Sequence, residues 1–222
     1  MLRCAIFDMD GVIVNTEPLY VEEGRKIFNK FNLDISEKEH YSYCGGSMGN
    51  MWSSIRKNHD FNELSVEELC NIFLKQIKDR IINEKNLKIS TDLIDLLKDL
   101  RKNKVKTALA SSSSMDVIRM ILNKFKLEKL FDYVISGEMI EKSKPEPDIF
   151  LNVIKVLKVR DKEALVFEDS SNGIIASKKA NIKVIGYKKY TLNAKGMDLA
   201  DWVIDDFSQV SFKKLNYFIK LN

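Results

Sequence analysis

CAIFDMDGVIV, residues 4–14, is a short apolar run that stops at two carboxylates and a glycine. A run of this length bounded by turn-forming residues is typical of a strand buried on both faces. We therefore expect a strand over Cys4 to Phe7, with Asp8 and Asp10 at its carboxyl end. An Asp-Gly pair also favours an ordinary turn, so this stretch by itself predicts a strand and no function.

Five further apolar runs follow, at residues 105–110, 133–135, 164–167, 184–187 and 202–204. Segments with helical periodicity lie between them, at residues 91–103, 115–127, 147–159 and 173–180, and a last helix is expected within 210–221. Alternating strands and helices predict an α/β fold, with a Rossmann-like parallel sheet covered by helices on both faces.

The region between the first two strands has a different pattern. It contains no convincing strand, and residues 19–31 and 66–82 have helical periodicity. We expect a catalytic core made of residues 1–14 and 86–222, with an inserted helical domain over 15–85. Residues 14–16 and 84–86 would be the hinges.

Composition excludes several classes of protein. The 222 residues carry a net charge of +4, spread along the chain in short basic runs without interleaved aromatics, so no nucleic-acid partner is expected. No apolar stretch approaches the roughly 18 residues that span a bilayer, and the acids at positions 8 and 10 exclude a signal peptide. We expect neither a membrane association nor a secreted protein.

Cysteine and histidine usage points to a cytoplasmic protein without a zinc site. Cys4, Cys44 and Cys70 are an odd set with no CxxC spacing, so we expect buried free thiols in a reducing compartment. His40 and His59 lie in the inserted region, away from the acidic residues in the sequence, and each is predicted to be a lone surface histidine.

Polar groups follow four of the predicted elements of the core. They are Asp8 and Asp10, the serines 111–114, Lys144 in a loop entering a helix, and the pair Glu168 and Asp169. Each has an ordinary explanation as a turn, a helix cap or a solvated charge. Together they would meet at the carboxyl edge of the sheet, where open α/β sheets bind ligands. Four carboxylates there would repel one another without a cation, and Mg²⁺ is the natural partner of such oxygen ligands.

Four strings carry a resemblance to a known family. DMDGV (8–12), LASSS (109–113), KSKPEPDIF (142–150) and VFEDSSNGI (166–174) resemble the four motifs of the haloacid dehalogenase-like superfamily, in the right order. The chain is most similar to the β-phosphoglucomutase-like phosphatases of that superfamily. The inserted helices resemble its helical cap, so the likeness covers essentially the whole chain.

The resemblance implies a role for each matched residue. Asp8 would be the nucleophile that becomes an aspartyl phosphate, and Asp10 the general acid and base. Ser111, Ser112 and Lys144 would bind the phosphoryl group. The magnesium ligands would be Asp8, Asp10 through its backbone carbonyl, Asp169, and Glu168 either directly or through water.

A glycine-rich stretch in the predicted cap has two interpretations. Residues 44–49 read CGGSMG. Gly45, Gly46 and Ser47 could form a loop that reaches the substrate, since glycines allow a backbone to approach a ligand closely. The same stretch could equally be a plain connector between two helices.

These expectations define a magnesium-dependent phosphomonoesterase acting on a small phosphorylated metabolite, for example a sugar phosphate. We expect a monomer or a weak homodimer. A phosphomutase is the alternative within the family, and Met48, Ser114 and Tyr20 stand where β-phosphoglucomutases carry an arginine, a lysine and a histidine. A phospho-receiver module is a distant alternative, because receivers have no inserted cap and order their acidic residues differently. Asp10 excludes a dehalogenase.

Overall fold

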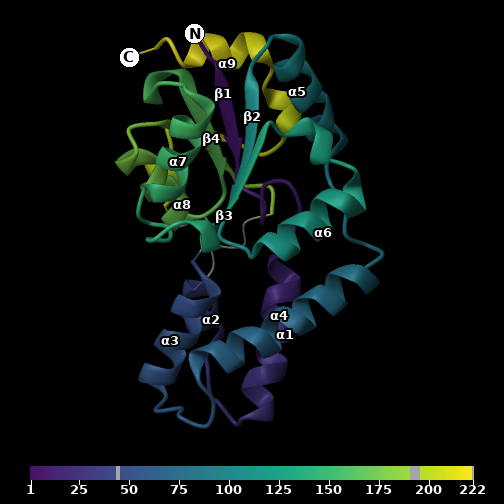
Figure 1. Cartoon of the computed structure of the whole chain (residues 1–222), viewed down its shortest axis with the longest axis vertical. Helices are drawn as coiled ribbons and strands as arrows, with labels where there is room; N and C mark the ends of the chain where they lie inside the picture. Colours follow the sequence, from purple (N-terminus) through teal and green to yellow (C-terminus); the bar gives the residue numbers. More distant parts are fainter. Residues whose placement is uncertain (44–45, 191–195, 222) are drawn as a thin grey trace.

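The computed structural model describes residues 1–43, 46–190 and 196–221, and Figure 1 shows a sheet-containing part joined to a smaller helical part. Within the described residues the sheet has six parallel strands in the order β3-β2-β1-β4-β5-β6. The strands are β1 (Cys4–Phe7), β2 (Lys106–Ser111), β3 (Tyr133–Ser136), β4 (Ala164–Glu168), β5 (Lys183–Tyr187) and β6 (Trp202–Ile204). The predicted α/β fold is confirmed, and every predicted strand is present with ends within one residue of those expected.

Two hydrophobic clusters, one on each face of the sheet, explain why the strands are apolar throughout. In β1 the side chains alternate, since Cys4 and Ile6 belong to one cluster while Ala5 and Phe7 belong to the other. The first cluster is covered by α7 (Asp148–Leu157) and α8 (Ser171–Lys179), and the second by α5 (Thr91–Lys102), α6 (Met115–Phe125) and α9 (Phe212–Phe218). A parallel sheet covered on both faces needs no polar side.

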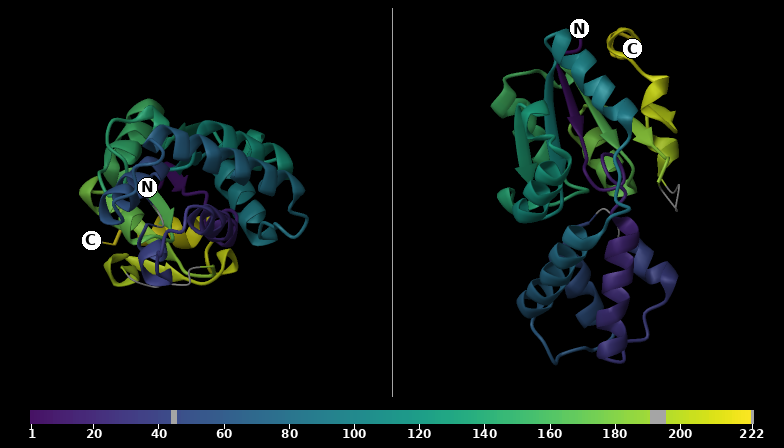
Figure 2. Two further views of the ribbon diagram at one scale, coloured as in Figure 1. Left: turned by 90° about the horizontal axis from the view of Figure 1, so that it is seen from below. Right: turned by 90° about the vertical axis from the view of Figure 1, so that its right-hand side faces the viewer.

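The helical insertion between β1 and β2 forms the cap, and it lies beyond the carboxyl ends of the strands in Figure 2. Its helices are α1 (Glu17–Lys30), α2 (Glu37–Ser42), α3 (Met48–Asn58) and α4 (Val66–Asn83). Trp52 is fully buried among them and packs edge-on against Phe28 and Phe73, with ring centroids 5.8 and 5.7 Å apart. Aromatic side chains therefore pack at the centre of the cap.

Two connections join the cap to the sheet. Val14 and Ile89 lie in these connections and form an antiparallel bridge, so the two chain segments run together. Lys124 of α6 ties the end of the cap to the core, because its Nζ donates to the carbonyl oxygens of Ile81 at 2.7 Å and Glu84 at 2.8 Å. On these contacts we propose residues 15–85 as the cap, with the bridge marking its base.

Sequence periodicity missed the helices α2 and α3. Met48 and Gly49 belong to the first turn of α3, so residues 44–49 are not wholly a loop as one interpretation had them. Ser47 is the N-cap of α3 and its Oγ accepts a hydrogen bond from the N–H of Asn50 at 3.2 Å. Helix α2 has six residues, too few for a periodic pattern. Helix α3 has eleven, and the helical spacing of Met48, Met51, Trp52 and Ile55 could have found it.

The predicted positions of the histidines and cysteines need correction. His40 is only 5% exposed, because its ring packs edge-on against Phe28 and beside Gly24, where a Cβ would come within 2.8 Å of Nε2. The surface prediction for this histidine is therefore wrong. Cys4 is buried as predicted, whereas Cys70 is only half-buried, and Cys44 lies outside the described residues.

Candidate active site

Side chains from four segments meet at the carboxyl edge of the sheet, beneath the cap. Asp8 follows β1, Ser111 ends β2, Glu168 ends β4 with Asp169 directly after it, and Lys144 comes from the loop between β3 and α7. Strands β2, β1 and β4 are adjacent in the sheet, so parallel pairing brings their ends together. The four predicted groups therefore converge.

Lys144 is the centre of the buried charge network. Its side chain is 2% exposed, and Nζ lies 2.5 Å from Asp8 Oδ1 and 2.5 Å from Glu168 Oε1. Burial by itself would lower the pKa of Lys144, but the two carboxylates outweigh burial and raise that pKa above its ordinary value. The lysine stays charged, and it neutralises part of the acidic cluster.

Both oxygens of Glu168 are already engaged. Oε1 accepts from Lys144, and Oε2 accepts from the N–H of Ser170 at 3.0 Å and its Oγ at 2.9 Å. Gly173 makes room for this carboxylate, since a Cβ at that position would lie 1.8 Å from Oε1. Glu168 was expected among the metal ligands, either directly or through water, and its two oxygens accept hydrogen bonds from Lys144 and Ser170.

Asp8 and Asp169 are crowded carboxylates. Burial is the largest cause that raises the pKa of each, with Glu168 adding repulsion to both and Lys144 acting in the opposite direction. Gly11 allows the approach of Asp169, because a Cβ there would lie 1.8 Å from its Oδ2, and the backbone of Gly11 has φ +79°. Excess negative charge at this point favours a cation.

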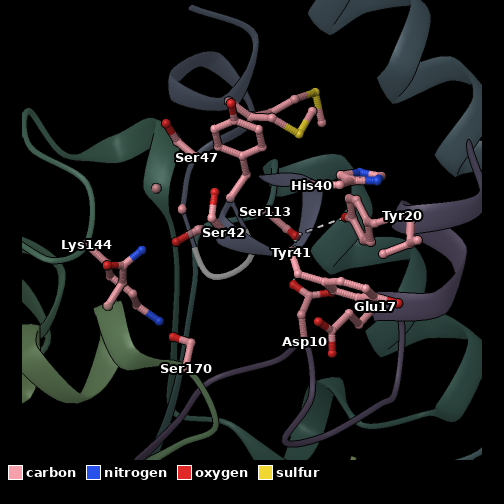
Figure 3. Close-up of a pocket in the computed structure, with 18 of the residues that line it drawn as sticks. Asp10, Glu17, Tyr20, His40, Tyr41, Ser42, Ser47, Ser113, Lys144 and Ser170 are labelled. Atoms are coloured by element: carbon pink, nitrogen blue, oxygen red, sulfur yellow. Dashed lines mark hydrogen bonds between the residues drawn. The ribbon is translucent and has the colours of Figure 1, made fainter. Parts of the chain in front are cut away.

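Asp10 is held by three hydroxyls. Its Oδ1 accepts from Thr16 Oγ1, while Oδ2 accepts from Ser113 Oγ at 2.8 Å and from Ser111 Oγ at 3.2 Å. Tyr20 of the cap contacts one of these hydroxyls, since its own hydroxyl lies 3.1 Å from Ser113 Oγ (Figure 3). Thr16 and Ser113 were missed by the sequence reasoning, although the serine run at 111–114 signals a second hydroxyl two residues after the first.

A cavity of about 1060 Å³ lies between the core and the cap. Asp8, Asp10, Ser112, Lys144 and Asp169 line it from the core. Ser111 is fully buried behind this wall and contacts Asp10 and the N–H of Ser113.

The cap closes the other side of the cavity. Gly46 and Ser47 line it, as one interpretation of their stretch predicted, whereas Gly45 lies outside the described residues. Beside them, Asn50 of α3 donates to Ser143 Oγ at 3.1 Å and links the cap to the Lys144 loop. The start of α3 therefore reaches both the cavity and the core.

The donor set fits a magnesium ion. Among the described residues no three His, Cys, Asp or Glu side chains form a complete metal cage. Mg²⁺ does not need one, because it is bound by one or two carboxylates together with waters and substrate phosphate oxygens. Asp8 and Asp169 supply two carboxylates at the cavity wall, and the backbone carbonyl of Asp10 is a third candidate ligand.

A capped α/β fold with these groups at its carboxyl edge defines a class of hydrolase. The chain matches the family described as haloacid dehalogenase-like hydrolase over residues 5–187, and it belongs to that family. Among its members the chain is structurally close to the β-phosphoglucomutase group. The β-phosphoglucomutase of Clostridium difficile is 28% identical, with a TM-score of 0.87 that covers 99% of this chain and 97% of that one.

Named relatives agree on the type of enzyme. A phosphorylated carbohydrates phosphatase of Thermotoga maritima is 30% identical over 195 residues, which is 86% of this chain and 88% of that protein. A validoxylamine A 7'-phosphate phosphatase of Streptomyces hygroscopicus subsp. limoneus is 25% identical, covering 95% and 96%. The chain is thus an enzyme, a hydrolase homologous to phosphatases.

No helix of the described residues is long and apolar enough to cross a membrane.

Proposed function

We propose that this enzyme is a magnesium-dependent phosphomonoesterase that transfers the phosphoryl group of a small metabolite to Asp8 and then to water. The observation that carries the proposal is the buried Lys144, held between Asp8 and Glu168 at the floor of the cavity. A fixed cation beside a carboxylate nucleophile stabilises the charge that spreads over phosphoryl oxygens in the transition state.

Asp8 is the proposed nucleophile. Its Oδ1 is bound by Lys144, which leaves Oδ2 to attack phosphorus while the bond from phosphorus to the leaving oxygen breaks. The aspartyl phosphate so formed is then hydrolysed, so that one difficult displacement becomes two easier ones. Ser112 and Lys144, with Gly46 and Ser47 from the cap, line the cavity and are the proposed contacts of substrate and phosphoryl group. Ser111, predicted from the sequence as such a contact, lies behind the cavity wall, and it is proposed to act through its hydrogen bond to Asp10.

Asp10 is the proposed general acid and base. It gives a proton to the leaving alkoxide in the first step and takes one from the attacking water in the second, so a single carboxyl serves both. The hydroxyls of Thr16, Ser111 and Ser113 orient it. These contacts supply the fixed geometry that proton transfer requires.

Asp8, Asp169 and the backbone carbonyl of Asp10 would hold the magnesium ion, which supplies positive charge to the phosphoryl oxygens when bound. Glu168 is proposed to bind the metal either directly or through water, while its oxygens also accept hydrogen bonds from Lys144 and Ser170. A sugar phosphate is the proposed kind of substrate, supported by the Thermotoga maritima relative named for phosphorylated carbohydrates. A cytoplasmic location and a monomeric or weakly dimeric state stay predictions from the sequence.

A phosphatase is favoured over a phosphomutase by the cap wall. Met48 lines the cavity at the start of α3 and can make no charged contact with a second phosphate. Arg56 does not substitute for an arginine there, because its guanidinium binds the carbonyl of Phe61 and Asn62 at the far end of α3. Ser114 caps α6.

The test is phosphate release from a panel of phosphomonoesters with magnesium and with excess chelator. We expect turnover only with the metal, and no phosphoenzyme in Asp8→Asn. Asp10→Asn should still form phosphoenzyme from an aryl phosphate, whose good leaving group needs little protonation. Full turnover of a metal-stripped sample would exclude the proposed mechanism. Rapid isomerisation of β-glucose 1-phosphate with little phosphate release would indicate a mutase instead.

A further inference from the structure

The cap wall of the cavity is rich in apolar and aromatic side chains. It includes Val21, Tyr41, Met48, Met51, Phe73 and Leu74. The polar groups beside them, Ser36, Ser42, Ser47 and Asn71, are uncharged hydroxyls and an amide. Such a wall can pack against carbon and exchange hydrogen bonds with hydroxyl groups.

The charges that line the cavity are mostly negative. Beyond Asp8, Asp10 and Asp169, the described lining residues include the carboxylates Glu17, Glu39 and Glu138. The cations among them are Lys144 and Lys38. Lys144 is committed to Asp8 and Glu168, and Lys38 is exposed to solvent.

Glu17 places negative charge near the reacting end. It is the first residue of α1, and it lines the cavity together with Asp10 and Asp169. In the view of Figure 3, Glu17 and Lys144 lie on opposite sides of the cavity. A magnesium ion and Lys144 can together accept one phosphoryl group, but a second anion bound toward the cap would be stripped of water beside carboxylates.

We propose that the leaving group of the substrate is an uncharged, hydroxyl-bearing molecule, and that the cavity rejects compounds carrying a second phosphate or a carboxylate. This inference rests on the proposed phosphatase function and narrows its substrate class. The rejection is built from the carboxylates of the cavity wall and from the scarcity of free cations among the described lining residues.

The test uses two pairs of substrates that differ in one charged group. Sorbitol 6-phosphate is compared with 6-phosphogluconate, and glucose 6-phosphate with glucose 1,6-bisphosphate, in excess magnesium. We expect kcat/KM to be at least about tenfold higher for the member of each pair that lacks the second charged group, since like charges brought together at a site oppose binding. Equal or faster turnover of 6-phosphogluconate and glucose 1,6-bisphosphate would overturn this inference and leave the phosphatase proposal intact. No turnover of any of the four would overturn both.

A charge reversal in the wall tests the cause. Met48→Arg adds a cation to the cavity, whereas Ile82→Arg adds the same charge at a position of α4 that is 64% exposed and outside the cavity lining. We expect Met48→Arg to reduce severalfold the ratio of kcat/KM between substrates without and with a second charged group, and Ile82→Arg to leave this ratio unchanged. High salt should narrow it as well, because ions screen repulsion. A preference that neither Met48→Arg nor salt alters would contradict an electrostatic origin.

Discussion

Lys144 combines a proposed catalytic role with a buried position among carboxylates. The sequence presents it as a lysine before a proline, a common surface arrangement, yet its side chain is 2% exposed and contacts two carboxylates. Its removal would leave Asp8 and Glu168 buried without a counter-charge, which is costly even though the intact pair contributes little net stability.

We therefore predict that Lys144→Ala lowers turnover by about 100-fold or more, because a preorganised charge at the phosphoryl group is lost. It should also lower the free energy of unfolding by about 3–5 kcal/mol at neutral pH. Steady-state kinetics and urea unfolding measure the two effects. Lys142→Ala, an exposed lysine two residues earlier, is the control and should change neither. Near wild-type activity in Lys144→Ala would assign the lysine a structural role only.

Tyr20 contacts Asp10 indirectly, because its hydroxyl is hydrogen-bonded to Ser113, which in turn donates to Asp10. We predict that Tyr20→Phe slows hydrolysis of an alkyl phosphate by about 3- to 10-fold, the equivalent of one hydrogen bond. An aryl phosphate should be affected little, because its leaving group needs little help from Asp10. Tyr133→Phe, which removes a hydroxyl bonded to Asn152 away from the cavity, is the matched control. Equal losses on both substrates would indicate general damage to the cavity.

At the scale of elements, α8 and β4 meet so closely that Gly173 determines where Glu168 can lie. Ser170 connects the two, since it caps α8 by accepting from the N–H of Gly173 at 3.0 Å and also donates to Glu168. The helix start, the acidic strand end and Lys144 are consequently one packed unit.

We predict that Gly173→Ala destabilises the protein by about 1–3 kcal/mol, because its Cβ would overlap the Glu168 carboxylate. It should lower turnover too, by displacing the partner of Lys144. Gly49→Ala provides the comparison, as this helical glycine has no atom within 4 Å of an added Cβ. Unfolding free energies of the two variants should differ in the stated direction, and similar values would contradict the assigned packing.

At the scale of the whole molecule, the cap and one face of the sheet share a single hydrophobic cluster. Residues such as Trp52 and Phe73 of the cap belong to the same cluster as Phe7 and Leu109 of the sheet. Shared burial favours one cooperative unfolding transition, so a perturbation inside the cap should be visible in the stability of the entire chain.

His40 offers such a perturbation. Burial, aided by Arg25, lowers its pKa to about 4 from an ordinary value near 6.5. Between these two pKa values His40 is protonated in the unfolded chain and neutral in the folded chain. The free energy of unfolding should therefore fall as the pH drops from about 6.5 toward 4. Between pH 7 and 5 we predict a loss through this group of roughly 1–2 kcal/mol.

The comparison between variants isolates that contribution. Urea unfolding of wild type and His40→Gln at both pH values should show a smaller pH-dependent loss in the variant, whatever its stability at pH 7. His59→Gln removes the other histidine of the chain, a half-buried residue bonded to Glu39, and is the control. An unchanged pH dependence in His40→Gln would show that its protonation is not linked to folding.

The sheet, the inserted cap and the convergence of Asp8, Asp10, Lys144, Glu168 and Asp169 were determined by local sequence. Apolar runs ending in polar residues set the strands, and parallel pairing brings their carboxyl ends to one edge whatever the details of packing. The four motifs by themselves indicate the family and the type of enzyme.

Only the tertiary structure decided which partners these side chains take. The bonds from Thr16 and Ser113 to Asp10, the engagement of both Glu168 oxygens and the burial of His40 depend on contacts between distant segments. Helix α3 was missed although Met48, Met51, Trp52 and Ile55 follow helical spacing, because the glycines of residues 45–49 favoured a loop. Long-range packing is not encoded in local spacing, so the set of side chains that forms the cavity wall is known only from the folded chain.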